Sequence, residues 1–82
     1  MILPAEVKMQ LERKAIDLGV SIVGVHSIRL TDDDTVSAIF DVTPDEDGSG
    51  LHLSFPMPQY VTEDDLPLFA QWLAAQHVGT VH

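Results

Sequence analysis

Two segments of this chain place apolar side chains at every second position, on either side of a polar loop. Residues 36–42 carry them at the even positions and residues 51–55 at the odd ones. A period of two is typical of strands with one buried face. The loop between them, TPDEDGSG at residues 43–50, contains the Gly, Pro and Asp that chain reversals require. The segment predicts a β-hairpin with an apolar inward face: Val36, Ala38, Phe40, Val42, Leu51, Leu53 and Phe55.

The same alternation predicts a register, because inward residues must face one another across the pair. The predicted inward pairs are Val42 with Leu51, Phe40 with Leu53 and Ala38 with Phe55. On the outward face this register places Asp41 opposite His52.

The flanking segments predict two helices and one more strand. Residues 4–18 contain good helix formers, with Pro4 suited to a first turn and Gly19 to a C-terminal stop. Leu3, Val7, Leu11, Ala15 and Leu18 form its apolar stripe. A final helix begins near Thr62 or Asp65 and ends at Gly79.

Residues 20–30 are rich in β-branched side chains and predict the first strand. Strict alternation places its side chains on two faces. The expected inward set is Ile22, Gly24, His26, Ile28 and Leu30, and the expected outward set is Val23, Val25, Ser27 and Arg29.

The predicted fold is therefore one α+β domain over residues 1–82, in the order α-β-β-β-α. Three strands form an antiparallel meander, and both helices pack on one face of it. Several apolar side chains would remain outside the core, on the open sheet face and on the outer sides of the helices. We expect them to support a homodimer or a partner-binding face: Met9, Ile16, Val23, Val25, Ile39, Leu68 and Trp72.

Charge is distributed unevenly over a net of −9. All four basic residues precede Leu30, and ten acidic residues with no Lys or Arg follow it. Such a surface attracts a basic protein partner. Nine of the acids form three clusters at predicted turns and at a helix start, and we expect them to engage that partner: Asp32, Asp33, Asp34, Asp45, Glu46, Asp47, Glu63, Asp64 and Asp65.

The element order is similar to that of the double-stranded-RNA-binding fold. Domains of that kind bind RNA through Lys and Arg near their second helix, where this chain has neither. Phosphate binding depends mainly on basic side chains, so direct nucleic-acid binding is not expected.

The loop begins like a calcium-binding loop, with acids at alternate positions before Gly50. A complete loop needs a bidentate Glu at its twelfth position, where Pro56 stands, and an apolar residue at its eighth, where His52 stands. The four histidines, His26, His52, His77 and His82, lack the spacing of zinc ligands. We therefore expect no metal site and no cofactor, although weak cation binding at 45–50 stays open.

Several classes of protein are disfavoured by what the chain lacks. It has no cysteine, no nucleophile-elbow or phosphate-loop motif and no apolar run of membrane-spanning length. Pro4 and Glu6 stand where a signal peptide would be basic and apolar. We expect a cytoplasmic protein that is not an enzyme and does not bind membranes.

The leading expectation is a small acidic interaction domain of bacterial or phage origin, dimeric, of the inhibitor, immunity-protein or nucleic-acid-mimic type. One alternative is a small-ligand or metal-binding domain with a pocket near Gly24 and His26, between sheet and helices. Another is a purely structural subunit.

Overall fold

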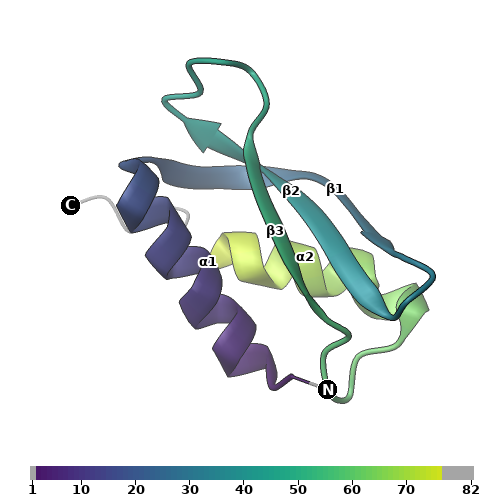
Figure 1. The fold of residues 1–82 in the computed structure, drawn as a ribbon. Coiled ribbons are helices and arrows are strands. Elements are labelled where there is room, and N and C mark those ends of the chain that lie inside the picture. The colour runs from purple at the N-terminus through teal and green to yellow at the C-terminus, as the bar shows by residue number, and fades with distance from the viewer. Residues whose placement is uncertain (1, 77–82) are drawn as a thin grey trace.

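The computed structural model describes residues 2–76, which form two helices and one three-stranded sheet (Figure 1). Gly19 ends the first helix at φ +69°, and its N–H donates to the carbonyl of Ile16 at 3.1 Å. The elements are α1 (Pro4–Leu18), β1 (Ser21–Leu30), β2 (Thr35–Thr43), β3 (Leu51–Pro56), a 3₁₀ turn η1 (Glu63–Asp65) and α2 (Leu66–Ala75).

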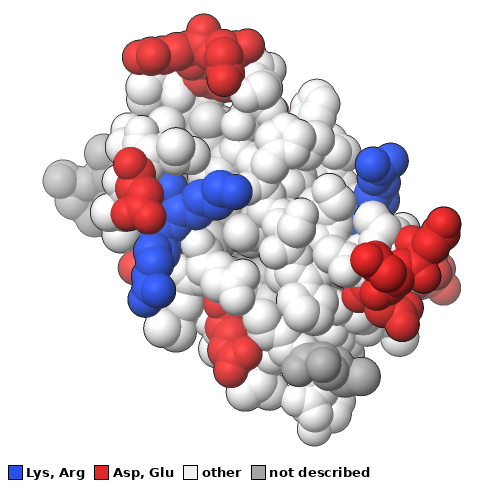
Figure 2. Space-filling model, in the orientation of Figure 1, with Lys and Arg blue, Asp and Glu red and all other residues white. Residues whose placement is uncertain are grey.

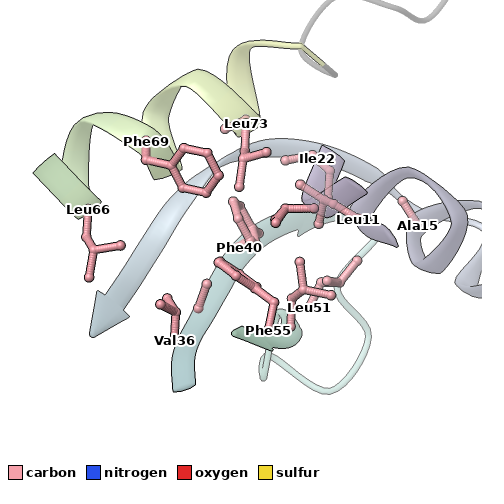
Figure 3. Close-up of a cluster of buried hydrophobic side chains, with 14 of the residues drawn as sticks. Leu11, Ala15, Ile22, Val36, Phe40, Leu51, Phe55, Leu66, Phe69 and Leu73 are labelled. Carbon is pink, nitrogen blue, oxygen red and sulfur yellow. The ribbon is translucent and has the colours of Figure 1, made fainter. Parts of the chain in front are cut away.

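The sheet is antiparallel in the order β1-β2-β3, and both helices cover the same face of it (Figure 1). The predicted α-β-β-β-α order and the α+β class are confirmed. Side chains from all five elements meet in one apolar core (Figure 3). Its most deeply buried members are Val7, Leu11, Val36, Ala38, Phe40, Ala70 and Leu73.

The predicted hairpin register is wrong by two residues. Phe40 lies opposite Leu51, Ala38 opposite Leu53 and Val36 opposite Phe55. A slip of two keeps every side chain on its face, so alternation alone does not distinguish the two registers. One consequence concerns His52, which lies across from Ile39 and not from Asp41.

Two β-bulges in β1 change the predicted faces of that strand. The register shifts once between Ile22 and Gly24 and again between Val25 and Ser27, which leaves Val23 and His26 as extra residues. Between the bulges the alternation is inverted. Val25 therefore packs against the core, whereas Gly24 and His26, expected inside, lie on the outward side.

The apolar stripe of α1 is shorter than predicted. Val7, Leu11 and Ala15 are buried, but Leu3 at its start and Leu18 at its end are 47% and 58% exposed. Leu3 is the residue before α1 and Leu18 is its last residue, so both lie at the ends of the predicted stripe.

Pro67 lies in the first turn of α2, where a proline is tolerated. Thr62 donates its hydroxyl to the Asp65 carboxylate at 3.0 Å, and the intervening residues form η1, so regular helix starts at Leu66. Within the described residues, α2 ends at Ala75. The predicted stop at Gly79 lies outside the described residues.

Contacts from the N-terminal part of the chain hold β3 in place near both of its ends. The backbone N–H of Gln59, just after β3, donates to the carbonyl of Ile2 at 2.8 Å. Farther along, the Lys14 ammonium of α1 donates to the backbone carbonyl of His52 in β3. The first helix is thereby tied to the strand beside it.

Two glycines with the same backbone conformation provide a matched test of packing at the hairpin loop. Gly48 and Gly50 both have φ +74°, yet a Cβ at Gly50 would lie 2.6 Å from the Phe40 carbonyl oxygen, and one at Gly48 would meet nothing within 4 Å. We expect Gly48→Ala to lower the free energy of unfolding by about 1 kcal/mol, the cost of the left-handed conformation. Gly50→Ala should cost about 1–3 kcal/mol more, since the backbone must also move apart.

Urea denaturation of the two variants checks this difference. Equal losses of stability would show that Gly50 does not lie against Phe40.

Candidate functional site

All nine clustered acidic residues are exposed, and they occupy two ends of the molecule. Asp32–Asp34 form the turn between β1 and β2, and Asp45–Asp47 lie in the loop between β2 and β3. The nine residues of β2 separate these two groups by roughly 30 Å. Figure 2 shows them as separate red patches, with a broad uncharged surface between.

The third group, Glu63–Asp65, lies at the same end as the β1–β2 turn. The backbone N–H of Met57 donates to the carbonyl of Asp34 at 3.0 Å, which holds the segment after β3 beside the turn. Leu66, which follows η1, lies beside the tip of β1 (Figure 3). We call Asp32–Asp34 with Glu63–Asp65 the turn end, and Asp45–Asp47 the loop end.

A short-range hydrogen bond orders the turn end. The Thr31 hydroxyl donates to Asp33 Oδ1, and this bond is the largest cause of a lowered pKa at the Asp33 carboxyl. Asp34 completes the reversal with φ +61°, a conformation that Asp tolerates better than most residues. The Asp33 carboxyl is therefore stabilised in its ionised form, and all three side chains of the turn are exposed to water.

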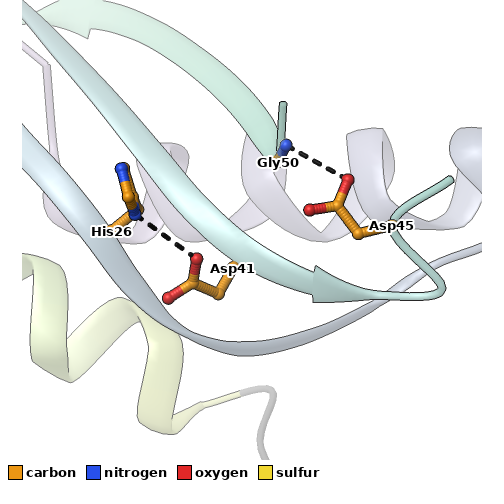
Figure 4. A network of polar contacts seen from close by, with 4 residues as sticks. All are labelled: His26, Asp41, Asp45 and Gly50. Atoms are coloured by element: carbon orange, nitrogen blue, oxygen red, sulfur yellow. Dashed lines mark hydrogen bonds and ion pairs between the residues drawn. The ribbon is translucent and has the colours of Figure 1, made fainter. Parts of the chain in front are cut away.

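The loop end is ordered by its own carboxylates. Asp47 Oδ1 accepts from the backbone N–H of Ser49 at 3.0 Å and from its hydroxyl at 2.7 Å. These two bonds, the backbone bond first, lower the pKa of Asp47. Asp45 Oδ1 accepts from the N–H of Gly50 at 3.2 Å (Figure 4).

His26 and Asp41 form a polar pair on the outward face of the sheet. His26 Nδ1 lies 3.6 Å from Asp41 Oδ1, and both side chains are more than half exposed (Figure 4). Gly24 lies directly across from Asp41. The prediction of a ligand pocket near Gly24 and His26, between sheet and helices, is therefore wrong, because the bulges turn both residues to the outside.

Within residues 2–76, no group of three or more His, Asp or Glu side chains is arranged to hold a metal ion. At the loop end, Asp45 and Asp47 each direct one oxygen to a backbone N–H of the loop. His77 and His82 lie outside the described residues.

The residues expected to mediate association fall into three groups. Met9 and Ile16 on α1, with Leu68 and Trp72 on α2, are exposed on the outer sides of the helices, which we call the helical face. Val23 is exposed as a bulge residue, and Ile39 is half-buried on the outward face of the sheet.

The prediction that Val25 mediates association is wrong, because Val25 packs against the core and is not available on the open sheet face. That face is polar instead of apolar. Six of its residues around Ile39 carry a hydroxyl group: Ser21, Ser27, Thr35, Ser37, Thr43 and Ser54.

The exposed ring of Trp72 is connected to the core by aromatic contacts. It stacks on Phe69 at a centroid distance of 5.9 Å, and Phe69 meets Phe55 of the core edge-on at 6.2 Å. The helical face thus includes an aromatic group supported from the core side.

One hollow was not predicted from the sequence. It lies between the C-terminal end of α1, the end of β2 and the loop end, and it has a volume of about 360 Å³. Its lining includes Leu18, the last residue of α1, and no pattern in the sequence places that residue beside the loop.

Comparison of the chain with protein-family models, with curated proteins and with solved structures gives no match. None of the helices in the described part of the chain is long and apolar enough to cross a membrane. A proposal for the function of this chain therefore depends on the chain's own geometry and charge.

The bonds at the loop end predict a pH dependence. A carboxyl whose pKa is lowered by folding stabilises the folded state above its ordinary range, near pH 4, and that contribution is lost as the pH falls through the lowered value. We expect Ser49→Ala to move the pKa of Asp47 part of the way back, because the hydroxyl bond is lost and the backbone bond stays.

Carboxyl ¹³C shifts followed through an acid titration measure this change. Thr31→Ala is the matched control, since it removes the corresponding bond at Asp33 and should leave Asp47 unchanged. An Asp47 titration that is insensitive to Ser49→Ala would contradict the described loop geometry.

Proposed function

We propose that this chain is a non-enzymatic protein-interaction domain that binds a basic protein partner through its acidic ends and forms a homodimer through its helical face. It would act in the cytoplasm, without direct contact to nucleic acid or membrane. Inhibitors, immunity proteins and nucleic-acid mimics of bacteria and phages are the kinds of protein with this profile.

The division of charge between the two sides of the fold carries this proposal. The first helix has three basic and three acidic residues, and α2 has no charged residue. Outside the helices there are one basic residue, Arg29, and ten acidic ones. The entire net charge of −9 thus belongs to the sheet, its turns and η1, whereas the helical layer is neutral.

This division separates the two kinds of association. A basic partner is attracted to the acidic ends, where carboxylates are exposed and ionised. A second copy is repelled by those same ends, because each copy carries −9. The neutral helical face, with Met9, Ile16, Leu68 and Trp72 exposed, is the surface on which two copies can meet without that repulsion.

The absence of buried polar groups supports a role without catalysis. Among residues 2–76 no polar or charged side chain is buried. General acid–base catalysis uses groups whose protonation is adjusted by desolvation, and such a setting is missing from this part of the chain. The exposed His26–Asp41 pair has the setting of an ordinary surface contact.

Binding of the basic partner can be tested by charge removal in matched positions. Affinity purification with the intact protein identifies the partner, and titration calorimetry with the purified partner then compares two variants. We expect Asp32→Asn/Asp33→Asn/Asp34→Asn to weaken binding about three- to tenfold, since several exposed ion pairs are lost. Glu6→Gln/Glu12→Gln/Asp17→Asn removes the same charge from α1 and should have less than a third of that effect.

Raising the salt from 50 to 500 mM should weaken the same complex further, because exposed charges are screened. A partner that binds equally at both salt concentrations, or one that responds more to the α1 variant, would refute the role of the acidic ends. Such a result would favour the purely structural subunit.

Dimer formation is tested separately by light scattering on a sizing column. We expect a dimer that persists in high salt and becomes monomeric with Ile16→Ser/Leu68→Ser, because apolar area on the helical face is lost. Val23→Ser is the control, since Val23 is similarly exposed but lies on the sheet. A monomer at millimolar concentration, or a dimer abolished by Val23→Ser alone, would contradict this arrangement.

A further inference from the structure

The hollow at the loop end combines two kinds of surface. Its floor is apolar and consists of Leu18 at the end of α1, Val20 just before β1, Val42 in β2 and Pro44 just after β2. Its rim is the loop that rises beyond β2 and β3 in Figure 1, and it carries Asp45, Glu46 and Asp47. An apolar floor under three carboxylates is complementary to a side chain with an aliphatic stem and a cationic tip.

The helix that supplies part of the floor adds to the negative potential. The hollow lies at the C-terminal end of α1, where the helix macrodipole places its partial negative charge. No basic residue occupies the last turn of α1 to offset it. The hollow is therefore more favourable to a cation than the rim carboxylates alone would make it.

The rim is preorganised before any partner binds. Asp45 and Asp47 each accept a hydrogen bond from the loop backbone through Oδ1. The Oδ2 atom of each carboxylate takes no part in these two bonds. Gly50 lies against the Phe40 carbonyl and fixes the point at which the loop rejoins β3. A rim held in this way loses little conformational entropy on binding.

We propose that this hollow is the seat of one arginine side chain of the basic partner, with its methylene stem on the apolar floor and its guanidinium against the rim carboxylates. This inference rests on the proposed function and names where, and through which residue type, the partner is recognised. It also assigns the two acidic ends different tasks. No residue of the turn end lines a described pocket. The turn end attracts the partner, and the loop end fixes its position.

Arginine fits the hollow better than lysine for two reasons. Its planar group has five N–H donors, enough to engage more than one carboxylate, and it is less strongly hydrated than an ammonium, so it can lie on apolar surface. A bare metal ion would leave the apolar floor unused, and an aliphatic side chain would leave the carboxylates unpaired.

A titration with short peptides tests the proposal on the intact protein. The probes are acetylated, amidated Gly-Arg-Gly, Gly-Lys-Gly and Gly-norleucine-Gly, and the readout is the backbone amide spectrum. For the arginine peptide we expect shifts concentrated at residues 18–20 and 42–50, with a Kd on the order of 1 mM. The lysine peptide should bind about two- to threefold more weakly, and the norleucine peptide at least about fivefold more weakly.

Three variants assign the binding to the floor and the rim. Glu46→Gln removes a rim charge at a side chain without a described loop bond, and Leu18→Ser removes exposed floor area. Each should weaken arginine-peptide binding about threefold. Asp33→Asn at the turn end is the matched control and should change the Kd by less than about 1.5-fold. Unchanged spectra outside the altered position show that each variant is folded.

The results separate this inference from the proposed function. Shifts centred on the turn end, equal effects of Asp33→Asn and Glu46→Gln, or equal binding of the norleucine peptide would overturn the arginine seat and leave a basic partner in place. Absence of shifts with the arginine peptide at 20-fold the expected Kd, roughly 20 mM, would also overturn it. The proposed function fails independently, if the purified partner binds without dependence on charge or salt.

Discussion

Side chains from both helices and from the other two strands converge on the inward face of β2. Val36, Ala38 and Phe40 are fully buried there, and Phe40 lies between Leu11 of α1 and Leu73 of α2 (Figure 3). A domain of 82 residues has little apolar area to bury, so a central strand covered on one face and paired on both edges is its main source of cohesion. Two of the three acidic groups, Asp32–Asp34 and Asp45–Asp47, lie shortly before and after this strand.

The element order was predictable because periodicity and stop signals are local properties. Residues 36–42 and 51–55 alternate with Ile39 as the one exception, and Pro4 and Gly19 delimit α1 as their backbone preferences require. The hairpin register was not predictable, because registers two residues apart bury the same side chains. The bulges at Val23 and His26 were missed for a related reason, since an inserted residue inverts the faces of a strand without any change of composition.

Exposure of the clustered acidic residues was predictable from the sequence, but their arrangement in space was not. Clusters of acids at turns are evident in the sequence, and all nine are exposed. Their division into two ends follows from the length of β2 and from the path of the segment after β3, which passes Asp34. The hollow beside Leu18 was beyond reach, because it depends on where the end of α1 lies relative to a loop more than twenty residues later.

The bulges of β1 and the Lys14 contact with β3 have a consequence for the sheet as a whole. Strands at the border of a sheet present unpaired backbone groups on which a strand of another molecule can add. Here one border strand is irregular at Val23 and His26, and the other has a backbone carbonyl at His52 occupied by an ammonium group. Both borders are thus poorer templates for addition of a strand from another molecule than a regular, fully open edge would be, while the loops at either end of the strands stay exposed.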